Sequence, residues 1–414
     1  MDADAFECNG PEAKTLCTAL FQAVDQGASD LHIIAGHRPT VRLNGRLQEL
    51  PGNVLNEACV RAGLLDLCPE CSREQFARDR NVDFALELSL KGRSQRFRAN
   101  YFMTGHAPGA CFRIIPSAIP DLGWANFPAD LAVRLTGFRN GLALITGVSG
   151  AGKTTTLAML INLLLSEGNY RIITVEEPIE YNFPSRGNSI VTQREVGRDV
   201  ATFADGLKYG LRQDPDVILV GEIRDRDTAQ MALSAAETGH LVFATLHTRD
   251  AKGAISRFAD LFPQQVQGEI RAQLAMGLRA VVCQHLLPST AGTKRELALE
   301  ILFNNSPIAS AIRTGKDESI DRNILTSRAE GMIPLDESVR RLFQAGKINQ
   351  ETAEQYVSDK SALARRPLFR FLPYFDFWTC ASAVLASLAF LATSVAWRAT
   401  SSAFFTASAA AFLA

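Results

Sequence analysis

The ten residues GVSGAGKTTT carry the strongest chemical signal in the chain. They match Gly-x-x-x-x-Gly-Lys-Ser/Thr, a motif whose glycines let the backbone wrap around phosphates while successive amides attract negative charge. The lysine of such a loop reaches the outer phosphates, and the following hydroxyl ligates Mg²⁺. The motif therefore predicts an ATP site with Mg²⁺. The predicted nucleotide contacts in this loop are Gly147, Ser149, Gly150, Gly152, Lys153, Thr154 and Thr155, with Thr154 on the metal.

A second candidate site is the stretch ITVEEPIEYNFP, which places Glu176, Glu177 and Glu180 within five residues. These acids follow the β-branched run at 172–175, which is typical of a buried parallel strand. Ligands of open α/β sheets bind at the carboxyl ends of the strands. The three acids are therefore a solvated strand exit, a metal site or a catalytic base, and their spacing alone leaves all three open.

Two further segments end in polar groups that suit the same site. DPDVILVGEIRD supplies a strand with Glu222 at its end, where a carboxylate contacts the Mg²⁺ shell through water or is merely solvated. AAETGHLVFATLHT carries His240 before a short strand and His247 after it, seven residues apart. That spacing does not suit a shared metal, but a histidine beside the phosphate loop can sense a γ-phosphate by hydrogen bonding.

The elements that position these residues form a predicted α/β domain over 137–300. The strand-like runs GLALITG, RIITVEE, DVILVGE and HLVFATLH alternate with longer helical patterns, which indicates a parallel sheet covered on both faces. Residues 1–116 contain short alternating runs such as PTVRLNG and VDFALELSL, typical of a small α+β domain. A linker is expected over 117–136, and a charged, mainly helical segment over 301–366.

Composition limits the remaining possibilities. A chain of 414 residues has room for two or three domains, and a net charge of -1 gives no global attraction to nucleic acid. Eight scattered cysteines are too sparse for a disulfide scaffold, and a single Cys-x-x-Cys pair does not complete a four-thiolate zinc site. The acidic N-terminal residues lack the pattern of a signal peptide, so we expect a cytoplasmic protein.

The last segment, 367–414, differs in kind. Residues 377–397 form an uncharged stretch of 21, long enough to span a bilayer, although its Ala, Ser and Thr content weakens insertion. The alternatives are a tail packed against the body and a sequence that is not native to such a protein, for example a frameshifted end. A membrane helix here would anchor the protein in a membrane.

The motifs together resemble one family, the hexameric ATPases of type II secretion and type IV pili. The resemblance covers about residues 12–360, and within the family it favours the pilus retraction branch. It rests on ASDLHIIAG, QRFRANYF, CFRIIP, GVSGAGKTT, TVEEPIEY, IVTQREVG, FADGLKYGLRQDPDVILVGEIRD, AAETGHLVFATLHT and RFADLFP. It implies a RecA-like P-loop ATPase domain with a smaller N-terminal α+β domain of PAS-like fold.

The resemblance also assigns roles to single residues. It implies that Glu180 polarises the attacking water, with Glu176 as a supporting acid. Glu222 and His247 complete the catalytic set. His240 matches the other position of the histidine motif and is a further predicted nucleotide-binding residue. Arg98 and Arg113 match arginines of the N-terminal domain that approach a nucleotide in the manner of an arginine finger.

Two features favour the retraction branch, and two residues depart from the family's usual pattern. No paired Cys-x-x-Cys zinc module follows the histidine strand, and ALEILFNNSPIASAIRTGK is similar to the retraction branch's C-terminal segment. Glu177 stands where the family usually has Asp, and Thr314 where it usually has Glu. The implied function is pilus retraction by a homohexamer at an inner-membrane platform protein, with a paralogous motor subunit as a further partner. The alternatives are an assembly or secretion ATPase and a weakly active accessory subunit.

Overall fold

The computed structural model describes residues 10–363, apart from 44, 91–92, 116–117, 185, 293 and 361–362. The stretch 377–397, for which a membrane helix is one prediction, lies outside these ranges, and so do the domain boundaries predicted at 116 and 366. Those boundaries stay predictions.

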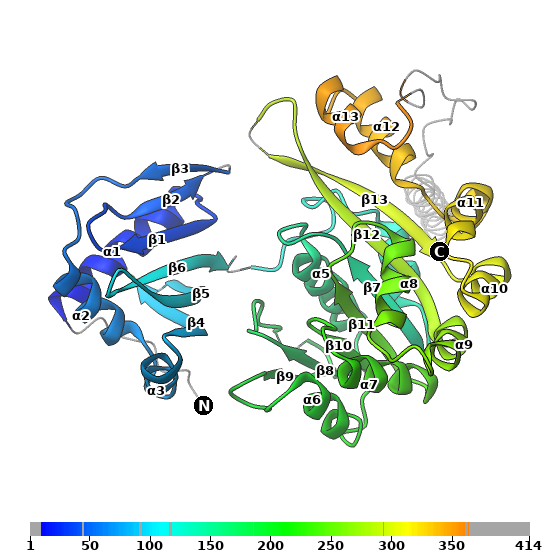
Figure 1. Ribbon diagram of the computed structural model, residues 1–414, viewed down its shortest axis with the longest axis horizontal. Coiled ribbons are helices and arrows are strands. Elements are labelled where there is room, and N and C mark those ends of the chain that lie inside the picture. The colour runs from blue at the N-terminus through cyan, green and yellow to red at the C-terminus, as the bar shows by residue number, and fades with distance from the viewer. Residues whose placement is uncertain are drawn as a thin grey trace, which may run out of the picture. The chain divides into compact units, whose positions relative to one another are not determined.

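The N-terminal part is built on an antiparallel sheet with the strand order β3-β2-β1-β6-β5-β4 (Figure 1). Its strands are β1 (Asp30–Ile34), β2 (Thr40–Leu43), β3 (Arg46–Glu49), β4 (Asn81–Leu90), β5 (Arg93–Thr104) and β6 (Ala107–Ile115). Its helices are α1 (Pro11–Asp25), α2 (Glu57–Leu67) and α3 (Glu70–Asp79). The alternation in β5 assigns its faces, since Phe97, Ala99 and Tyr101 are buried whereas Arg96 and Arg98 point to the opposite, polar face.

The second sheet contains seven strands in the order β13-β12-β7-β11-β10-β8-β9 (Figure 1). All neighbours are parallel except β12 and β13, which form an antiparallel pair at one edge. The strands are β7 (Gly141–Thr146), β8 (Arg171–Glu176), β9 (Ile190–Glu195), β10 (Val217–Val220), β11 (Leu241–Leu246), β12 (Leu278–Pro288) and β13 (Arg295–Phe303). The central strands β7, β10 and β11 are buried at every position, as a sheet covered on both faces requires.

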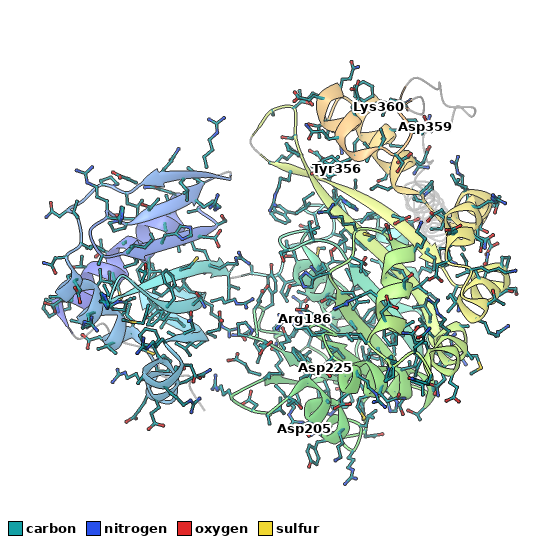
Figure 2. The ribbon with its side chains drawn as sticks, in the orientation of Figure 1. Arg186, Asp205, Asp225, Tyr356, Asp359 and Lys360 are labelled. Carbon is teal, nitrogen blue, oxygen red and sulfur yellow. The ribbon has the colours of Figure 1, made fainter. Side chains whose placement is uncertain are left out.

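In the described part of the chain, six helices accompany the strands of this sheet, and side chains cap three of them, α6, α7 and α8. Their bounds are α4 (Ala129–Thr136), α5 (Lys153–Glu167), α6 (Phe203–Gly210), α7 (Arg226–Glu237), α8 (Ala251–Asp260) and α9 (Gln267–Gly277). Asp225 caps α7 by accepting a bond from the Thr228 amide at 2.8 Å (Figure 2). Thr202 caps α6 by accepting a bond from the amide of Asp205 at 3.0 Å. Each cap fixes where the chain leaves a loop and enters a helix.

The C-terminal helices pack on this domain through apolar side chains, among them Ile312 and Ile320, and polar contacts add to the attachment of α11. They are α10 (Ser306–Thr314), α11 (Glu318–Thr326), the 3-10 turn η1 (Arg328–Glu330), α12 (Leu335–Gln344) and α13 (Gln350–Tyr356). Arg271 of α9 binds both carboxylate oxygens of Asp317 at 2.8 and 2.9 Å, and Lys252 of α8 lies 2.7 Å from Asp321. The sheet continues to Phe303, three residues beyond the core predicted from the sequence.

The predicted fold class is confirmed. The named strands GLALITG, RIITVEE, DVILVGE and HLVFATLH are β7, β8, β10 and β11, in a parallel arrangement. The N-terminal sheet and the parallel sheet each have their own hydrophobic core, the first with Phe97 and Phe112 and the second with Phe243 and Phe258. The sequence did not predict β9 or the β12–β13 hairpin as strands.

Candidate ATP site

The phosphate loop joins the end of β7 to the start of α5. Gly147 and Gly152 have φ angles of 142° and 87°, which side chains other than glycine rarely adopt. A Cβ atom on Gly147 would lie 2.5 Å from the carbonyl oxygen of Gln284 and 3.0 Å from the Cβ of Ala151. Only glycine therefore fits there. The backbone forms a cradle at a helix N-terminus, which is the arrangement that binds phosphate.

Lys153 begins α5 and folds back over this loop. Its Nζ donates to the carbonyl oxygens of Gly147 at 2.8 Å and Val148 at 3.2 Å, and it lies 3.4 Å from Nδ1 of His247. Burial lowers the pKa of the ammonium, while the nearby charge of Glu222 acts in the opposite direction. The Lys153 side chain is thus held over the phosphate loop, as expected for the lysine that was predicted to reach the outer phosphates.

The neighbouring predicted contacts lie on the same loop and helix turn. Ser149 and Gly150 are exposed at the apex of the loop. The hydroxyl of Thr155 lies 3.1 Å from the hydroxyl of Tyr181, which follows Glu180 in the chain. The first turn of α5 is therefore tied directly to the acidic segment after β8.

The three glutamates after β8 occupy three different environments. Glu176 is buried and accepts bonds from the Thr174 hydroxyl at 2.6 Å and from Nε2 of Gln193 at 3.2 Å. Burial raises the pKa of this carboxyl to about 7. Glu177 is exposed and faces Arg224 at 3.0 Å, and the peptide bond between Glu177 and Pro178 is cis. The spacing of the three glutamates in the sequence did not predict these different environments.

Glu180 is the glutamate that faces the phosphate loop. Burial raises the pKa of its carboxyl, whereas the Arg98 charge, a hydrogen bond from Thr154 and the Arg113 charge lower it. The residues on either side fix its place. The Ile179 amide donates to Glu195 at 3.1 Å, and the Tyr181 carbonyl accepts from Gln193 at 2.8 Å. A half-buried carboxylate beside Thr154, the hydroxyl predicted to bind Mg²⁺, has the chemistry needed to hold a water molecule for attack.

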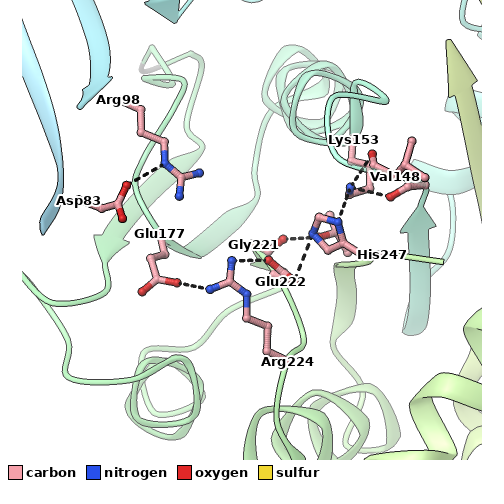
Figure 3. A network of polar contacts seen from close by, with 11 residues as sticks. Asp83, Arg98, Val148, Lys153, Glu177, Gly221, Glu222, Arg224 and His247 are labelled. Carbon is pink, nitrogen blue, oxygen red and sulfur yellow. Dashed lines mark hydrogen bonds and ion pairs between the residues drawn. The ribbon is translucent and has the colours of Figure 1, made fainter. Parts of the chain in front are cut away.

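A continuous row of polar contacts joins four strand ends at this edge of the sheet (Figure 3). Nε2 of His247 lies 3.1 Å from Oε1 of Glu222, while its Nδ1 faces Lys153. An ammonium group donates only, so Nδ1 accepts and Nε2 carries the proton that is donated to Glu222. The other oxygen of Glu222 is 2.8 Å from Arg224, which also contacts Glu177. The row therefore runs from the phosphate loop to the exit of β8.

His240 is not brought into this row. It precedes β11, while His247 follows it, so the two histidines lie at opposite ends of one buried strand. Nδ1 of His240 lies 3.0 Å from the carbonyl oxygen of Ala235, at the end of α7. Its own carbonyl accepts a bond from the amide of Gly141, where β7 begins rather than where it ends. Within this chain, His240 is therefore far from the phosphate loop.

The two predicted arginines lie opposite each other on β5 and β6. Arg98 and Arg113 are register partners, and each faces a carboxylate of its own sheet. Nε of Arg98 lies 3.7 Å from Asp83, and Nε of Arg113 donates to Asp30 at 3.0 Å. Both charges act on the carboxyl of Glu180. Each arginine thus has a carboxylate partner within the N-terminal sheet and an electrostatic influence on the predicted catalytic acid.

Two kinds of feature are absent from the described residues. Within those ranges, no group of three or more His, Cys, Asp or Glu side chains is arranged to hold a metal ion. The three glutamates after β8 therefore do not form a three-carboxylate metal site. In the same part of the chain, no helix has the length and apolar character needed to cross a bilayer.

Sequence reasoning missed several residues that build this site. Gln193, Glu195 and Tyr181 hold the segment around Glu180, and Arg224 bridges two glutamates. Gln193 and Glu195 lie in the motif IVTQREVG, and Arg224 in VGEIRD. Both motifs had contributed to the resemblance, but nothing in their spacing showed that their side chains reach the acidic segment.

Comparison with known proteins identifies the family. A family model described as type II/IV secretion system protein matches residues 7–366. PilT, the type IV pilus retraction ATPase of Pseudomonas aeruginosa, is 38% identical over 80% of this chain and 94% of its own. The type IV pilus ATPase PilU of the same organism is 36% identical over 80% of this chain and 85% of its own.

A solved structure and a secretion relative complete the comparison. The crystal structure of the pilus retraction motor PilT with bound ADP has a TM-score of 0.73, with 37% identity over 84% of this chain and 98% of that one. The type II secretion system ATPase E of Vibrio cholerae is 34% identical, but over only 67% of this chain and 56% of its own. The fold, the phosphate loop and these matches agree: the chain belongs to the type II/IV secretion system protein family, and it is an ATPase.

Proposed function

We propose that this ATPase powers type IV pilus retraction as a homohexameric motor. The observation that carries the proposal is the placement of Glu180 beside Thr154, together with the row from Lys153 through His247 to Glu222. The matches to PilT and PilU favour the pilus branch, because they reach 38% and 36% identity over 94% and 85% of those proteins' own length. The type II secretion system protein E of Aeromonas hydrophila is 33% identical over 73% of its own length.

ATP would bind with its phosphates in the loop between β7 and α5. The glycines of this loop leave room for phosphate oxygens, and Lys153 would turn from the loop carbonyls toward the outer phosphates. Thr154, and Glu222 through water, would hold Mg²⁺, which would supply charge neutralisation for the phosphates. The hydroxyl and the carboxylate that this requires stand at the same edge of the sheet.

Glu180 would orient the attacking water, with His247 and Glu222 close to the γ-phosphate. Burial raises the pKa of the Glu180 carboxyl, which makes it a better proton acceptor than a solvated glutamate. His247 donates through Nε2 to Glu222 and accepts through Nδ1, so its ring orientation is fixed from both sides. Glu176 would support Glu180 from the buried side of the strand exit.

Arg98 and Arg113 would couple nucleotide binding to movement of the N-terminal domain. Both are paired with carboxylates of their own sheet, and a bound γ-phosphate offers them stronger charge-assisted bonds. A ligand drives a movement only when one state gives it contacts that the other lacks. In a ring, closure of successive subunits would act on an inner-membrane platform protein and withdraw pilin subunits.

Two measurements test the proposal. The purified chain should hydrolyse ATP, and a strain that lacks the gene should carry excess pili and show no twitching. Loss of pili in that strain would indicate an assembly motor, and no ATP turnover by the purified chain would indicate an accessory subunit of a second motor.

Attachment at the inner membrane is part of the proposal and has its own test. The full chain should be compared by membrane fractionation with a version ending at Arg366. If both versions fractionate alike, association with a membrane does not require residues 367–414.

A further inference from the structure

Arg224 has no role in the mechanism described so far, yet it lies between two glutamates from different strand ends (Figure 3). One terminal nitrogen is 3.0 Å from Oε2 of Glu177, after β8, and the other is 2.8 Å from Oε2 of Glu222, after β10. A guanidinium group is planar and rigid, so two carboxylates bound to its two terminal nitrogens are fixed relative to each other. A lysine could supply the charge but not this geometry.

The backbone around Arg224 is already fastened to both neighbouring strands. The Gly221 amide donates to the Val175 carbonyl at 2.8 Å, and the Ile223 amide donates to the Thr245 carbonyl at 3.0 Å. The Thr245 hydroxyl donates to the Gly221 carbonyl at 2.6 Å. Because the main chain is held on both sides, the remaining freedom at this point is the rotation of side chains.

Glu222 uses both of its oxygens in this arrangement. Oε1 accepts from His247 and Oε2 from Arg224, so the carboxylate plane is set by two partners on opposite sides. The side chain of Glu222 is only 18% exposed, so water gives it little alternative hydrogen bonding. Without Arg224, the carboxylate would keep a single partner and rotate around it.

We infer that Arg224 is a positioning residue for ATP hydrolysis, which fixes the carboxylate of Glu222 and uses Glu177 as its second anchor. The inference rests on the proposed ATPase mechanism and gives Glu177 a role that differs from that of Glu180. The Glu177 side of the bridge is exposed, and exposed ion pairs contribute little to stability. The effect should therefore appear in turnover rather than in folding.

A double-mutant cycle tests the bridge. Steady-state ATPase measurements on Arg224→Gln should show kcat about tenfold lower with KM for ATP nearly unchanged, as expected when Glu222 is misplaced in the transition state but ATP still binds. Glu177→Gln should lower kcat by about threefold, because the guanidinium keeps one anchor. The kcat of the double variant should be no lower than that of Arg224→Gln alone, since both changes disrupt the same bridge between Glu177 and Glu222.

Conservative variants separate positioning from charge. Arg224→Lys should be as slow as Arg224→Gln because lysine has no planar fork. Glu177→Asp should keep most of the activity because it retains a carboxylate. The matched control is Arg61→Gln, which breaks an exposed pair with Glu57 at 2.7 Å on α2 and should leave kcat unchanged.

Binding of a fluorescent ATP analogue, thermal melting and ring assembly should be measured for every variant. Unchanged kcat in Arg224→Gln, independent losses that multiply in the double variant, or a loss that follows failed assembly would each overturn the inference. The proposed function is tested separately, since turnover by the unmodified chain and its loss in Glu180→Gln do not depend on Arg224.

Discussion

The two ends of β11 each carry a histidine, and their surroundings differ completely. At the carboxyl end, His247 lies between Lys153 and Glu222, beside the phosphate loop. At the amino end, His240 bonds to a carbonyl oxygen at the end of α7 and approaches none of the charged groups of the site. The same residue type at the two ends of one strand thus contacts the groups of the predicted ATP site at one end and the end of a helix at the other.

The difference follows from the direction of the strands. In a parallel sheet all carboxyl ends meet at one edge, and helices that follow the strands begin there with exposed amides. That edge therefore collects Lys153, Glu180 and Glu222, which come from distant parts of the sequence. Helices end at the amino edge of the sheet, where their last carbonyl oxygens are free to accept a hydrogen bond from a histidine ring.

The largest effect is expected when the positive charge of the loop is removed. Lys153→Ala should weaken ATP binding by about a thousandfold, since two charge-assisted bonds to phosphates, at roughly 1.5 to 3 kcal/mol each, together contribute about 4 kcal/mol. Equilibrium binding of a fluorescent ATP analogue measures this. Lys252→Ala, which removes a pair with Asp321 on α11, is the matched control and should bind normally. Equal loss in both variants would mean that the loop does not hold the phosphates.

Glu176 should make the free energy of unfolding depend on pH. Its folded pKa of about 7 lies above the ordinary value of 4.5, so the folded state holds this proton more tightly than the unfolded state. Its contribution to the free energy of unfolding is complete below pH 4.5 and is lost as pH rises through 7, by about 3 kcal/mol in total.

Denaturant unfolding of Glu176→Gln from pH 5 to pH 8 checks this contribution. In this variant the free energy of unfolding should fall less between pH 5 and pH 8 than in the unmodified chain. A fall that comes from Glu300, whose pKa burial also raises to about 7, should remain. A pH dependence identical to that of the unmodified chain would show that Glu176 is ionised at little cost.

The histidine pair gives the smallest and most selective effects. His247→Gln should lower kcat by about tenfold, since it disturbs a hydrogen bond to a partly buried carboxylate. His240→Gln should change kcat by less than about twofold, because glutamine can still donate to the helix end. Steady-state ATPase assays on both variants make the comparison directly, and equal losses would contradict the assignment of His240 to local structure.

Much of this molecule could be predicted because its signals are local. The strands β7, β8, β10 and β11 are short apolar runs bounded by turns, and the phosphate loop is a contiguous motif whose strand and helix context is visible in the sequence. The hairpin of β12 and β13 was missed although PSTAGTK between its strands is a turn signal, because apolar runs as long as these fit a buried helix as well as a strand.

The supporting contacts could not be predicted because they depend on the order of strands in the sheet. Arg224 meets Glu177 only because β8 and β10 are neighbours, although the two residues lie far apart in the sequence. Gln193 reaches Glu176 only because β9 pairs with β8 in register. The sequence shows these residues, but only the order of the strands in the sheet shows which residues they contact.

The central claim is that Glu180 acts in hydrolysis and not in binding. The most direct measurement is a pair of assays on Glu180→Gln, with ATP affinity from a fluorescent analogue and turnover from phosphate release. The account predicts affinity within about threefold of the unmodified chain and turnover lower by about a hundredfold or more. Turnover near that of the unmodified chain would contradict it.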